Sequence, residues 1–464
     1  MQKHRSKLKL QGLTVYTIDE YEYFSSVVDK KNINAIVFPN QSSAMEEKEG
    51  LIQYCIDKHI RVFVLPQLNE VPKDGSMQNM IREVKIEDLL GREEIKINMN
   101  EISSFLSGKR VMVTGGAGSI GSELSRLIST FPVEKIIVLD NAETPLHNIQ
   151  LELTDREKNK AESSFDLAAF EERFKFVIAD VRDEARLEKV FNAYKPQVVF
   201  HAAAYKHVPL MEANPCEAIN VNVQGSRNVA DMAVKYGVEK MVMVSTDKAV
   251  NPTNVMGCSK RLAEIYVQTL SKAIINGEVE GKTKFITTRF GNVLGSNGSV
   301  IPRFREQIIN GGPVTVTHKD IIRFFMTIPE ACRLVLEAAT MGEGYEIFVF
   351  DMGQPVRIAD LARNMISLAG LVPDKDIKIV YTGLRPGEKL YEELLSNKEN
   401  TIPTGHKKIS VAKVREYSFK DILAEYTKLR EQAVSMDKMG TVKQMKAIVP
   451  EFKSQNSVYA QLDK

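Results

Sequence analysis

The stretch that decides the fold of this chain is Thr114-Gly115-Gly116-Ala117-Gly118-Ser119-Ile120-Gly121. It follows the apolar run Arg110–Val113 and precedes the helical pattern Ser122–Ser129, which places its glycines at a strand-to-helix turn. Gly115 permits a tight turn, Gly118 lets the backbone come close to a pyrophosphate, and Gly121 allows the helix to pack closely on the strand. Unpaired N–H groups at the start of the helix, around Ser119 and Ile120, can bind phosphate oxygens. The stretch therefore predicts a dinucleotide-binding α/β domain.

Strands and helices alternate along the chain after this turn. Five further apolar runs, separated by helical patterns, predict the strands Lys135–Asp140, Phe174–Ala179, Val198–His201, Lys240–Ser245 and Phe285–Arg289. Such an order is typical of a doubly wound parallel sheet, which we expect over residues 101–290. Beyond it the alternation gives way to Gly-, Pro- and Asn-rich turns with helices such as Pro329–Ala339 and Ile358–Ala369. We expect residues 291–464 to form a smaller substrate-binding domain that ends in surface helices.

The first hundred residues show the same alternation of predicted strands and helices, without a glycine-rich phosphate loop. Apolar runs at Leu13–Ile18, Asn34–Pro39 and Arg61–Pro66 alternate with helical patterns near Tyr21–Lys31 and Ser43–His59. This pattern predicts a partial N-terminal α/β domain over residues 1–100, with a linker at Val71–Ser107 and one short strand at Glu83–Ile86. Because the loop is missing, an interaction or regulatory role is favoured over a second catalytic site.

Composition excludes several classes of protein. With 62 Lys and Arg against 60 Asp and Glu, the net charge of +2 gives no overall field that would gather nucleic acid or a membrane surface. The four cysteines, at positions 55, 216, 258 and 332, lie far apart, so we expect neither disulfides nor a zinc site, and no other metal site is predicted. The sequence has no apolar run of 18 residues, so no membrane span is expected and a cytoplasmic location fits best.

Three features downstream of the glycine turn support a bound dinucleotide. Asp140 ends the second strand about twenty residues after the turn, where a carboxylate can accept hydrogen bonds from the adenosine ribose. NAD is thus favoured over NADP, which remains the alternative. Asp180 and Val181 follow the third strand and are placed to meet the adenine. After the fourth strand, the small side chains of Ala202 and Ala203 let a cofactor lie against the backbone, whereas His201 alone is better explained as a core histidine.

Catalytic candidates come directly after the fifth strand. Thr246, Asp247 and Lys248 supply a hydroxyl, a carboxyl and an amine at the edge of the sheet where open α/β proteins hold substrate. Met256 and Lys260 follow on the next helical pattern. A solvated Asp-Lys pair at a turn is the plain alternative, and the glycine turn upstream favours the functional interpretation.

From Thr114 to about Leu395 the sequence resembles the extended short-chain dehydrogenase/reductase family, and within it the UDP-N-acetylglucosamine 4,6-dehydratases of capsular polysaccharide biosynthesis. The matching segments are Thr114–Gly121, His201–Pro209, Asn222–Gly225, Ser245–Lys248, Arg289–Ser296, Gly298–Pro302 and Leu384–Lys389. Most short-chain enzymes have Tyr-x-x-x-Lys, whereas Met256 precedes Lys260 here, and a thioether cannot take a proton from an alcohol. The same exchange is a feature of the long dehydratases that this chain resembles.

The resemblance implies a hydro-lyase that uses NAD and a UDP-sugar and is expected to be a homo-oligomer. It adds Lys206, Asn222 and Lys260 to the cofactor residues, and it implies substrate contacts for His207, Met256, Asn292, Val300, Arg303, Arg323, Arg385 and Glu388. Longer members carry membrane helices with this part on the cytoplasmic side, and we expect the chain to begin partway through their N-terminal α/β domain.

The reaction that the resemblance implies is oxidation at sugar C4, loss of water across C5 and C6, and return of the hydride to C6. Lys248, if neutral, would remove the C5 proton, and Asp247, if protonated, would protonate the departing C6 hydroxyl. Thr246 would hold the C4 oxygen, and Lys260 would bind the nicotinamide ribose. The alternatives are a nucleotide-sugar 4-epimerase, which needs no such acid-base pair, and a non-catalytic NAD-binding scaffold.

Overall fold

A computed structural model describes residues 9–10, 13–14, 28, 30–31, 33, 35–38, 54–55, 60–64, 82–83, 95, 97–160, 165–393 and 401–463. The chain divides into two compact units. The larger comprises residues 94–303, 316–359 and 381–464, and the smaller comprises residues 1–93, 304–315 and 360–380. Within the described residues, no helix has both the length and the apolar character needed to cross a membrane.

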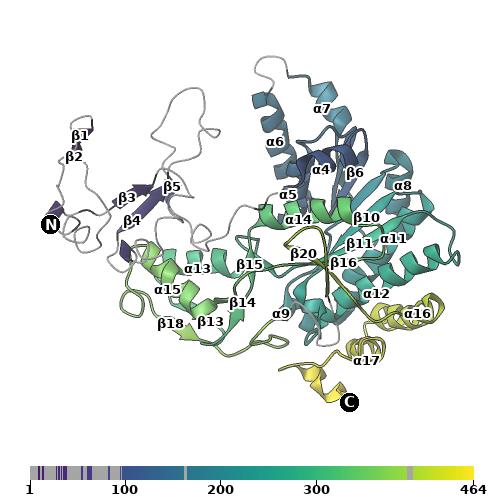
Figure 1. Ribbon diagram of the computed structural model, residues 1–464. Coiled ribbons are helices and arrows are strands. Elements are labelled where there is room, and N and C mark those ends of the chain that lie inside the picture. Colours follow the sequence, from purple (N-terminus) through teal and green to yellow (C-terminus); the bar gives the residue numbers. More distant parts are fainter. Residues whose placement is uncertain are drawn as a thin grey trace. The chain divides into compact units, whose positions relative to one another are not determined.

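The larger unit is built on a twisted sheet (Figure 1). In the described part of the chain this sheet has nine strands in the order β19-β20-β16-β11-β10-β9-β6-β7-β8. Their bounds are β6 Arg110–Thr114, β7 Lys135–Asp140, β8 Phe174–Ile178, β9 Val198–His201, β10 Lys240–Val244, β11 Lys284–Arg289, β16 Ile347–Phe350, β19 Thr401–Pro403 and β20 Ile409–Ala412. The seven strands from β8 to β16 run parallel, β20 pairs antiparallel with β16, and β19 pairs antiparallel with β20.

Strand order reverses at β6, because β7 and β8 continue to one side of it and β9, β10 and β11 to the other. The doubly wound parallel sheet predicted from the sequence is therefore confirmed. In such sheets, ligands bind in the crevice at the carboxyl ends of the strands, at the point where the strand order reverses. The glycine turn after β6 lies at this point.

Alternate residues of the strands supply two separate cores. In β6, Met112 belongs to one cluster of buried side chains, whereas Val111 and Val113 belong to the other. The second cluster is completed by α4 (Met99–Leu106), α5 (Ser119–Ile128), α6 (Glu143–Lys160), α7 (Leu167–Arg173) and α14 (Ile328–Met341). The first is completed by α8 (Glu184–Tyr194), α9 (Val208–Ala213), α10 (Pro215–Ala218), the π-helix η4 (Ile219–Gly225), α11 (Ser226–Lys235), α12 (Val255–Ile275), α16 (Phe419–Val434) and α17 (Lys438–Ile448).

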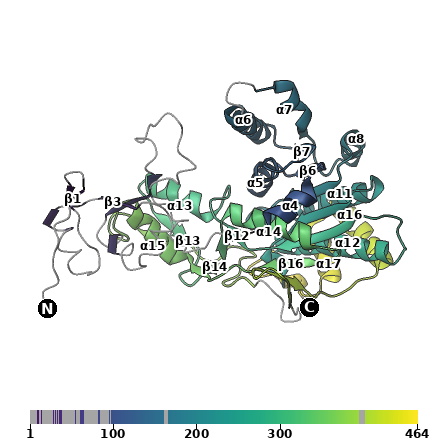
Figure 2. The same cartoon turned by 45° about the horizontal axis from the view of Figure 1, so that its top comes forward.

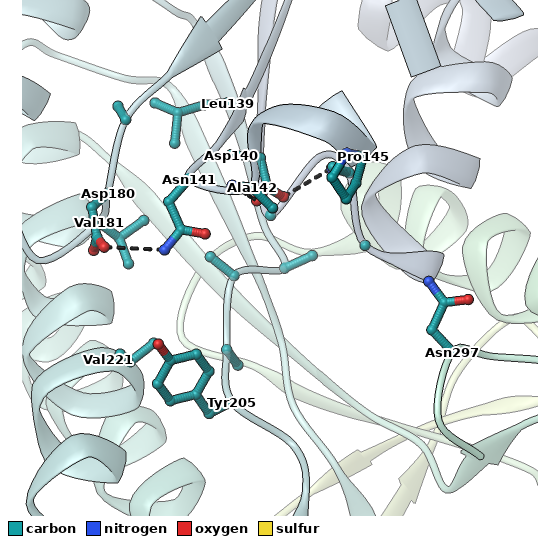
Figure 3. A pocket seen from close by; sticks show the side chains of 17 residues that line it. Leu139, Asp140, Asn141, Ala142, Pro145, Asp180, Val181, Tyr205, Val221 and Asn297 are labelled. Carbon is teal, nitrogen blue, oxygen red and sulfur yellow. Dashed lines mark hydrogen bonds between the residues drawn. The ribbon is translucent and has the colours of Figure 1, made fainter. Parts of the chain in front are cut away.

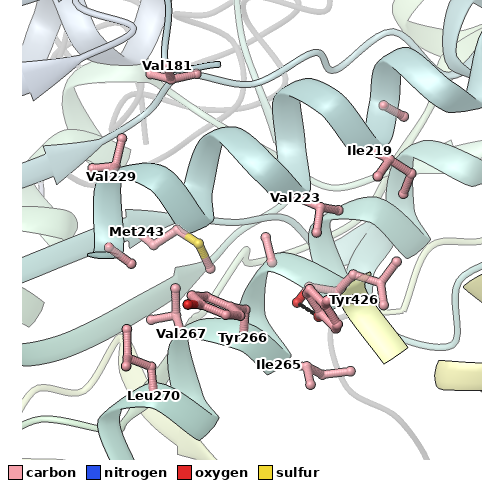
Figure 4. Packing of buried hydrophobic residues seen from close by; sticks show 14 of the residues in the cluster. Val181, Ile219, Val223, Val229, Met243, Ile265, Tyr266, Val267, Leu270 and Tyr426 are labelled. Carbon is pink, nitrogen blue, oxygen red and sulfur yellow. Dashed lines mark hydrogen bonds between the residues drawn. The ribbon is translucent and has the colours of Figure 1, made fainter. Parts of the chain in front are cut away.

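Two expectations about this unit are wrong. The predicted linker contains the helix α4, which buries Ile102 and Leu106 against the sheet. The last fifty residues were expected to form surface helices, yet α16 and α17 bury an apolar face on α12, and α16 lies beside α12 in Figures 1 and 2. Tyr426 of α16 packs against Tyr266 of α12 with ring centroids 5.8 Å apart, and its hydroxyl donates to the Leu262 carbonyl (Figure 4).

The larger unit also contains shorter elements. They are β12 (Asn292–Val293) paired with β15 (Phe325–Met326), β14 (Ile322–Arg323) paired with β17 (Val356–Arg357), and the 3₁₀ helices η5 (Asp247–Ala249) and η6 (Val458–Leu462). The chain also forms α13 (Val300–Ile309), α15 (Ile358–Leu368) and the pair β13 (Val314–Val316) with β18 (Ile379–Tyr381).

The N-terminal residues that the structure describes confirm part of the predicted strand pattern. Strands β3 (Ala35–Phe38) and β4 (Arg61–Val64) pair in parallel, and β5 (Arg82–Glu83) adds antiparallel to β4. The short strands β1 (Lys9–Leu10) and β2 (Leu13–Thr14) pair with each other. Most of the two predicted N-terminal helices lies outside the described residues.

The packing of α16 on the core leads to a stability prediction. Leu429 is 1% exposed within the core cluster, whereas Val434, at the end of the same helix, is 68% exposed. Leu429→Ala should lower the free energy of unfolding by about 2–5 kcal/mol, because it leaves a cavity, and Val434→Ala should change it little. Urea denaturation of both variants measures this, and equal small effects would mean that α16 does not belong to the core.

Candidate active site

The glycine turn leaves no room for side chains at three of its positions, and at one of them, Gly116, a Cβ would lie 2.4 Å from Val138 Cγ1. Gly115 has φ of +67°, and a Cβ there would lie 2.5 Å from the Ala203 nitrogen. A Cβ on Gly121 would lie 2.1 Å from the Gly115 carbonyl oxygen. Gly118 differs, because a Cβ would meet only the Gly115 oxygen, at 3.2 Å, and the residue lines a cavity. The tight turn and the close packing of α5 are thus seen directly.

A cavity of about 260 Å³ opens beside this turn at the carboxyl ends of β6 to β9 (Figure 3). Its wall is formed by Gly115, Ala117, Gly118, Leu139, Asp140, Asn141, Ala142, Pro145, Ala179, Asp180, Val181, Ala202, Ala203, Ala204, Tyr205, Val221 and Asn297. Asp140 faces it while accepting hydrogen bonds from the backbone N–H groups of Ala117 and Ala142, both at 2.9 Å. Each carboxylate oxygen keeps a lone pair that a ribose hydroxyl could use.

Asp180 follows β8, which pairs with the strand that Asp140 ends, and it lines the same cavity. Arg182 donates to it, and this hydrogen bond lowers the pKa of Asp180 to about 2. Asn141 also donates to it, at 3.1 Å (Figure 3). Asp180 is therefore ionised at neutral pH, and with Val181 it lines the part of the cavity where the adenine is predicted to lie.

His201 is a core residue, in agreement with the interpretation from sequence. The Thr114 hydroxyl lies 2.7 Å from Nδ1, and Ser226 Oγ lies 2.9 Å from Nε2. Burial lowers the pKa of His201 to about 3, so the ring is neutral. It joins β6, β9 and α11, and we assign it no chemistry.

Asn222 and Lys206, two predicted cofactor residues, occupy different settings. Asn222 is buried, accepts from the Tyr205 N–H at 2.7 Å, and donates to the Tyr205 carbonyl and to Ser259 at 2.9 Å. It therefore shapes the loop that carries Ala203, from within the core. Lys206 is exposed on that loop outside the cavity wall. Contact of either residue with a cofactor stays a prediction.

The catalytic candidates form a compact charged group where β10 ends. Lys248 Nζ lies 3.0 Å from Asp247 Oδ1 and 3.2 Å from Asn292 Oδ1. The Thr246 hydroxyl donates to the same Asp247 oxygen at 2.9 Å. The Asp247 side chain is fully buried, and its Oδ2 atom has no hydrogen-bond partner among the residues that the structure describes. The plain alternative of a solvated pair at a turn is therefore wrong.

The charge on Lys248 departs from the expectation of a neutral amine. Burial lowers the pKa of Lys248, but the carboxylates of Asp247 and Glu392 raise it by more, so the net shift is upward. In the protein without ligands, Lys248 is thus an ammonium ion. A neutral Lys248 requires a change in its surroundings.

Gly291 makes room for the buried carboxylate. A Cβ at this position would lie 2.9 Å from Asp247 Oδ2 and 3.1 Å from the Met352 methyl group. The Asp247 N–H also donates to the Phe290 carbonyl at 3.0 Å. The segment after β11 therefore fixes the aspartate from both its backbone and its side chain.

Met256 and Lys260 lie one turn apart on α12, and both are buried. Met256 belongs to the apolar core cluster, which agrees with a role in packing. Burial lowers the pKa of Lys260 to about 8, against the effect of Glu264. Glu264 accepts both hydrogen bonds of an Arg289 fork, at 2.9 and 2.7 Å, and one from Ser245 at 2.6 Å.

Arg323 and Arg385, two of the predicted substrate residues, differ in whether their N–H groups are already used in hydrogen bonds within the protein. Arg323 is buried and donates to the carbonyls of Ile322, Leu390 and Lys389 at 2.7–3.3 Å, so phosphate binding would require it to exchange these bonds. Arg385 is exposed and pairs with Glu388 at 3.2 Å. Substrate contact by both arginines stays a prediction.

Two more predicted substrate residues, Val300 and Arg303, lie after β12. Val300 is the first residue of α13, Arg303 lies one turn later, and both follow the loop in which Gly298 occurs. A Cβ on Gly298 would lie 2.7 Å from His207 Cε1, so the loops after β9 and β12 meet at this point. The backbone N–H of Asn297 donates to Ser119 at 3.2 Å, which joins the same loop to the start of α5.

Glu392 is a residue of the site that no sequence pattern indicated. Its Oε1 atom lies 3.6 Å from Lys248 Nζ and 3.7 Å from Arg323 Nε. The quoted motif ended at Lys389, and the pair Glu392-Glu393 just beyond it carries no spacing that marks a site. Only the fold brings Glu392 to Lys248.

Comparison with known proteins gives matches over most of the chain. Residues 111–414 match a family model described as polysaccharide biosynthesis protein. The capsular polysaccharide biosynthesis protein CapD of Staphylococcus aureus is 44% identical over 411 residues, 89% of this chain and 64% of that protein. The probable polysaccharide biosynthesis protein EpsC of Bacillus subtilis is 45% identical over 397 residues, 85% of this chain and 62% of that protein. The chain thus spans less than two thirds of the length of these two relatives.

Two further similarities concern shorter proteins. The UDP-glucose 4-epimerase of Rickettsia canadensis is 39% identical over 292 residues, 63% of this chain and 79% of that protein. Among solved structures, Pen from Bacillus thuringiensis aligns with a TM-score of 0.56 at 28% identity, over 71% of this chain and 99% of that one.

The close packing at Gly121 leads to a prediction about cofactor retention. Gly121→Ala should destabilise the protein by about 1–3 kcal/mol and reduce the dinucleotide that copurifies, because α5 must move away from the turn. Gly405→Ala is the control, since a Cβ there meets nothing within 4 Å. Denaturation and the nucleotide content of the purified proteins measure both effects. An unchanged Gly121→Ala protein would contradict the assigned role of the turn.

Proposed function

The chain belongs to the polysaccharide biosynthesis protein family, and we propose that it is an NAD-dependent dehydratase that converts UDP-N-acetylglucosamine to the UDP-4-keto-6-deoxy sugar. The observation that carries this proposal is the buried pair of Asp247 and Lys248, 3.0 Å apart, at the carboxyl edge of the sheet. An elimination needs an acid and a base side by side, and this pair can supply both.

The cavity beside the glycine turn fits NAD. Gly115 and Gly121 hold the turn, Gly118 leaves the backbone open to a pyrophosphate, and the start of α5 supplies N–H groups. Asp140 would accept from the adenosine ribose, and its carboxylate disfavours the additional phosphate of NADP. NAD held by these residues would supply the hydride acceptor for sugar C4 and the hydride donor for C6.

The observed ion pair can become the required acid and base without gaining or losing a proton. Transfer of one proton from Lys248 Nζ to Asp247 Oδ1 turns the ammonium and carboxylate into an amine and a carboxylic acid. Water exclusion by a bound sugar favours the uncharged couple, because burial disfavours charge. We infer that this transfer activates the site.

The elimination then restores the ion pair. The Lys248 amine takes the C5 proton, which the C4 ketone acidifies, and becomes an ammonium ion. Asp247 gives its proton to the C6 hydroxyl, which leaves as water, and becomes a carboxylate. Thr246, which donates to Asp247 in the protein without ligands, would turn toward the C4 oxygen. Lys260, with a pKa of about 8, would stabilise negative charge near the nicotinamide ribose.

A nucleotide-sugar 4-epimerase is the second candidate, and the similarity to the Rickettsia canadensis enzyme favours it. An epimerase does not remove the C5 proton or the C6 hydroxyl, so it has no use for a buried Asp-Lys pair. The two reactions are distinguished by the product.

Incubation of purified protein with UDP-N-acetylglucosamine tests the proposal. We expect the NMR spectrum to gain a C6 methyl signal and a keto form at C4, and we expect no accumulation of NADH absorbance. UDP-N-acetylgalactosamine as the product would favour the epimerase, and steady NADH formation would indicate an ordinary dehydrogenase.

Substitution of the pair should abolish elimination specifically. Asp247→Asn can donate a hydrogen bond but no proton, and Lys248→Ala leaves no base, so each should slow product formation by a factor on the order of 10² to 10⁴. In deuterium oxide the wild-type product should carry deuterium at C5. Asp155→Asn is the control, because Asp155 pairs with Lys158 on the exposed surface. A Lys248→Ala enzyme with the wild-type rate would show that the proton is taken elsewhere, and Lys206 and His207 would then be the next candidates.

The two residues of α12 should differ in their effect. Met256→Leu should keep appreciable activity, because a buried thioether contributes shape and apolar contact alone. Lys260→Ala should weaken NAD binding, which titration of cofactor-depleted protein would show as a raised Kd. Equal loss of activity in the two variants would contradict a packing role for Met256.

A further inference from the structure

Glu392 places a second carboxylate beside Lys248. Its side chain is 4% exposed, and its Oε1 atom lies 3.6 Å from Lys248 Nζ. The segment that carries it is held firmly, because Arg323 donates to the carbonyls of Lys389 and Leu390 and its Nε lies 3.7 Å from the same glutamate oxygen. The position of the carboxylate is therefore fixed by the fold.

Lys248 thus faces a defined set of groups from four elements. Asp247 approaches it from η5, Asn292 from β12, Glu392 from the segment after the Arg385–Lys389 loop, and Arg323 from β14. Asp247 and Glu392 favour the ammonium, and Arg323 and burial oppose it. If Asp247 is the acid of the elimination, it is uncharged at that stage, and Glu392 is the remaining carboxylate next to the lysine.

We propose that Glu392 is a positioning residue that orients the Lys248 side chain toward the sugar and governs how readily it releases its proton. This inference rests on the proposed role of Lys248 as the base. The direction of the effect on Lys248 follows from charge. A nearby carboxylate favours the ammonium form of the lysine, so removal of the carboxylate favours the amine form. Without Glu392, the limb of the pH profile in which activity rises with pH should move to lower pH.

The matched pair of variants is Glu392→Gln and Glu393→Gln. Glu393 is the adjacent residue, but its side chain is 46% exposed and accepts from Asn251 at 2.9 Å. Both variants lose one negative charge from the same segment. They differ in whether that charge lies beside Lys248.

The first measurement needs no sugar. Competitive acetylation with acetic anhydride over a pH series, read by mass spectrometry, gives the amine fraction of Lys248, whose side chain is 15% exposed. An opposite charge this close commonly shifts a pKa by about one unit or more, so labelling of Glu392→Gln near neutral pH should rise on the order of tenfold. Glu393→Gln should label like the wild type, and Glu392→Asp, with its carboxylate withdrawn by one methylene group, should lie between. If Glu392→Gln does not fold, the labelling of Lys248 in Glu392→Asp, compared with the wild type, tests the inference.

The second measurement is the pH profile of kcat with UDP-N-acetylglucosamine. The rising limb of Glu392→Gln should lie at lower pH and its maximal rate should fall, with KM nearly unchanged, because the residue acts through Lys248. If Lys248 is labelled equally in Glu392→Gln and Glu393→Gln, this inference is overturned, whichever reaction the enzyme catalyses. A wild-type protein that forms no methyl-bearing product, together with shifted labelling, would overturn the dehydratase proposal and keep the contact between Glu392 and Lys248.

Discussion

The balance of charge around Lys248 is the constraint on which the rest of the site depends. A buried ammonium is costly unless carboxylates surround it. Asp247 is the neighbour of Lys248 in the chain, and the fold brings Glu392 to it from a distant segment. Arg323 then offsets the second carboxylate and anchors its segment. Two carboxylates thus lie beside two cationic side chains. In such balanced surroundings, transfer of one proton from the lysine to the aspartate requires little free energy, as an acid-base pair must allow.

A second buried network of charged and polar side chains holds the backbone next to Asp247 and Lys248. Glu264 of α12 accepts from Arg289 at the end of β11 and from Ser245, which directly precedes Thr246. Glu264 is fully buried and pairs with both Arg289, at 2.7 Å, and Arg261, at 3.2 Å, so removal of its carboxylate would take this partner from two buried guanidinium groups and cost about 3–5 kcal/mol. The network therefore fixes the ends of two strands and, through Ser245, the start of the segment that carries Asp247 and Lys248.

The sequence was sufficient to predict the parallel sheet, because strands buried on both faces are nearly continuous apolar runs. The bounds predicted for β7 and β9 match those observed. The sequence was insufficient for β16, β19 and β20, because these strands have only three or four residues each and no helical pattern separates β19 from β20. At the site, Asp247 and Lys248 were found because they are adjacent in the chain. Glu392 was not, because contacts between distant segments leave no local pattern, and the net charge of Lys248 depends on those contacts.

One isotope measurement tests the central claim that a single site oxidises C4 and then returns the hydride to C6 of the same sugar. UDP-N-acetylglucosamine carrying deuterium at C4 is incubated with the protein, and the product is examined by NMR and mass spectrometry. The account predicts that the deuterium appears in the C6 methyl group of the keto product. Deuterium retained at C4 of an epimerised sugar, or collected in free reduced cofactor, would contradict it.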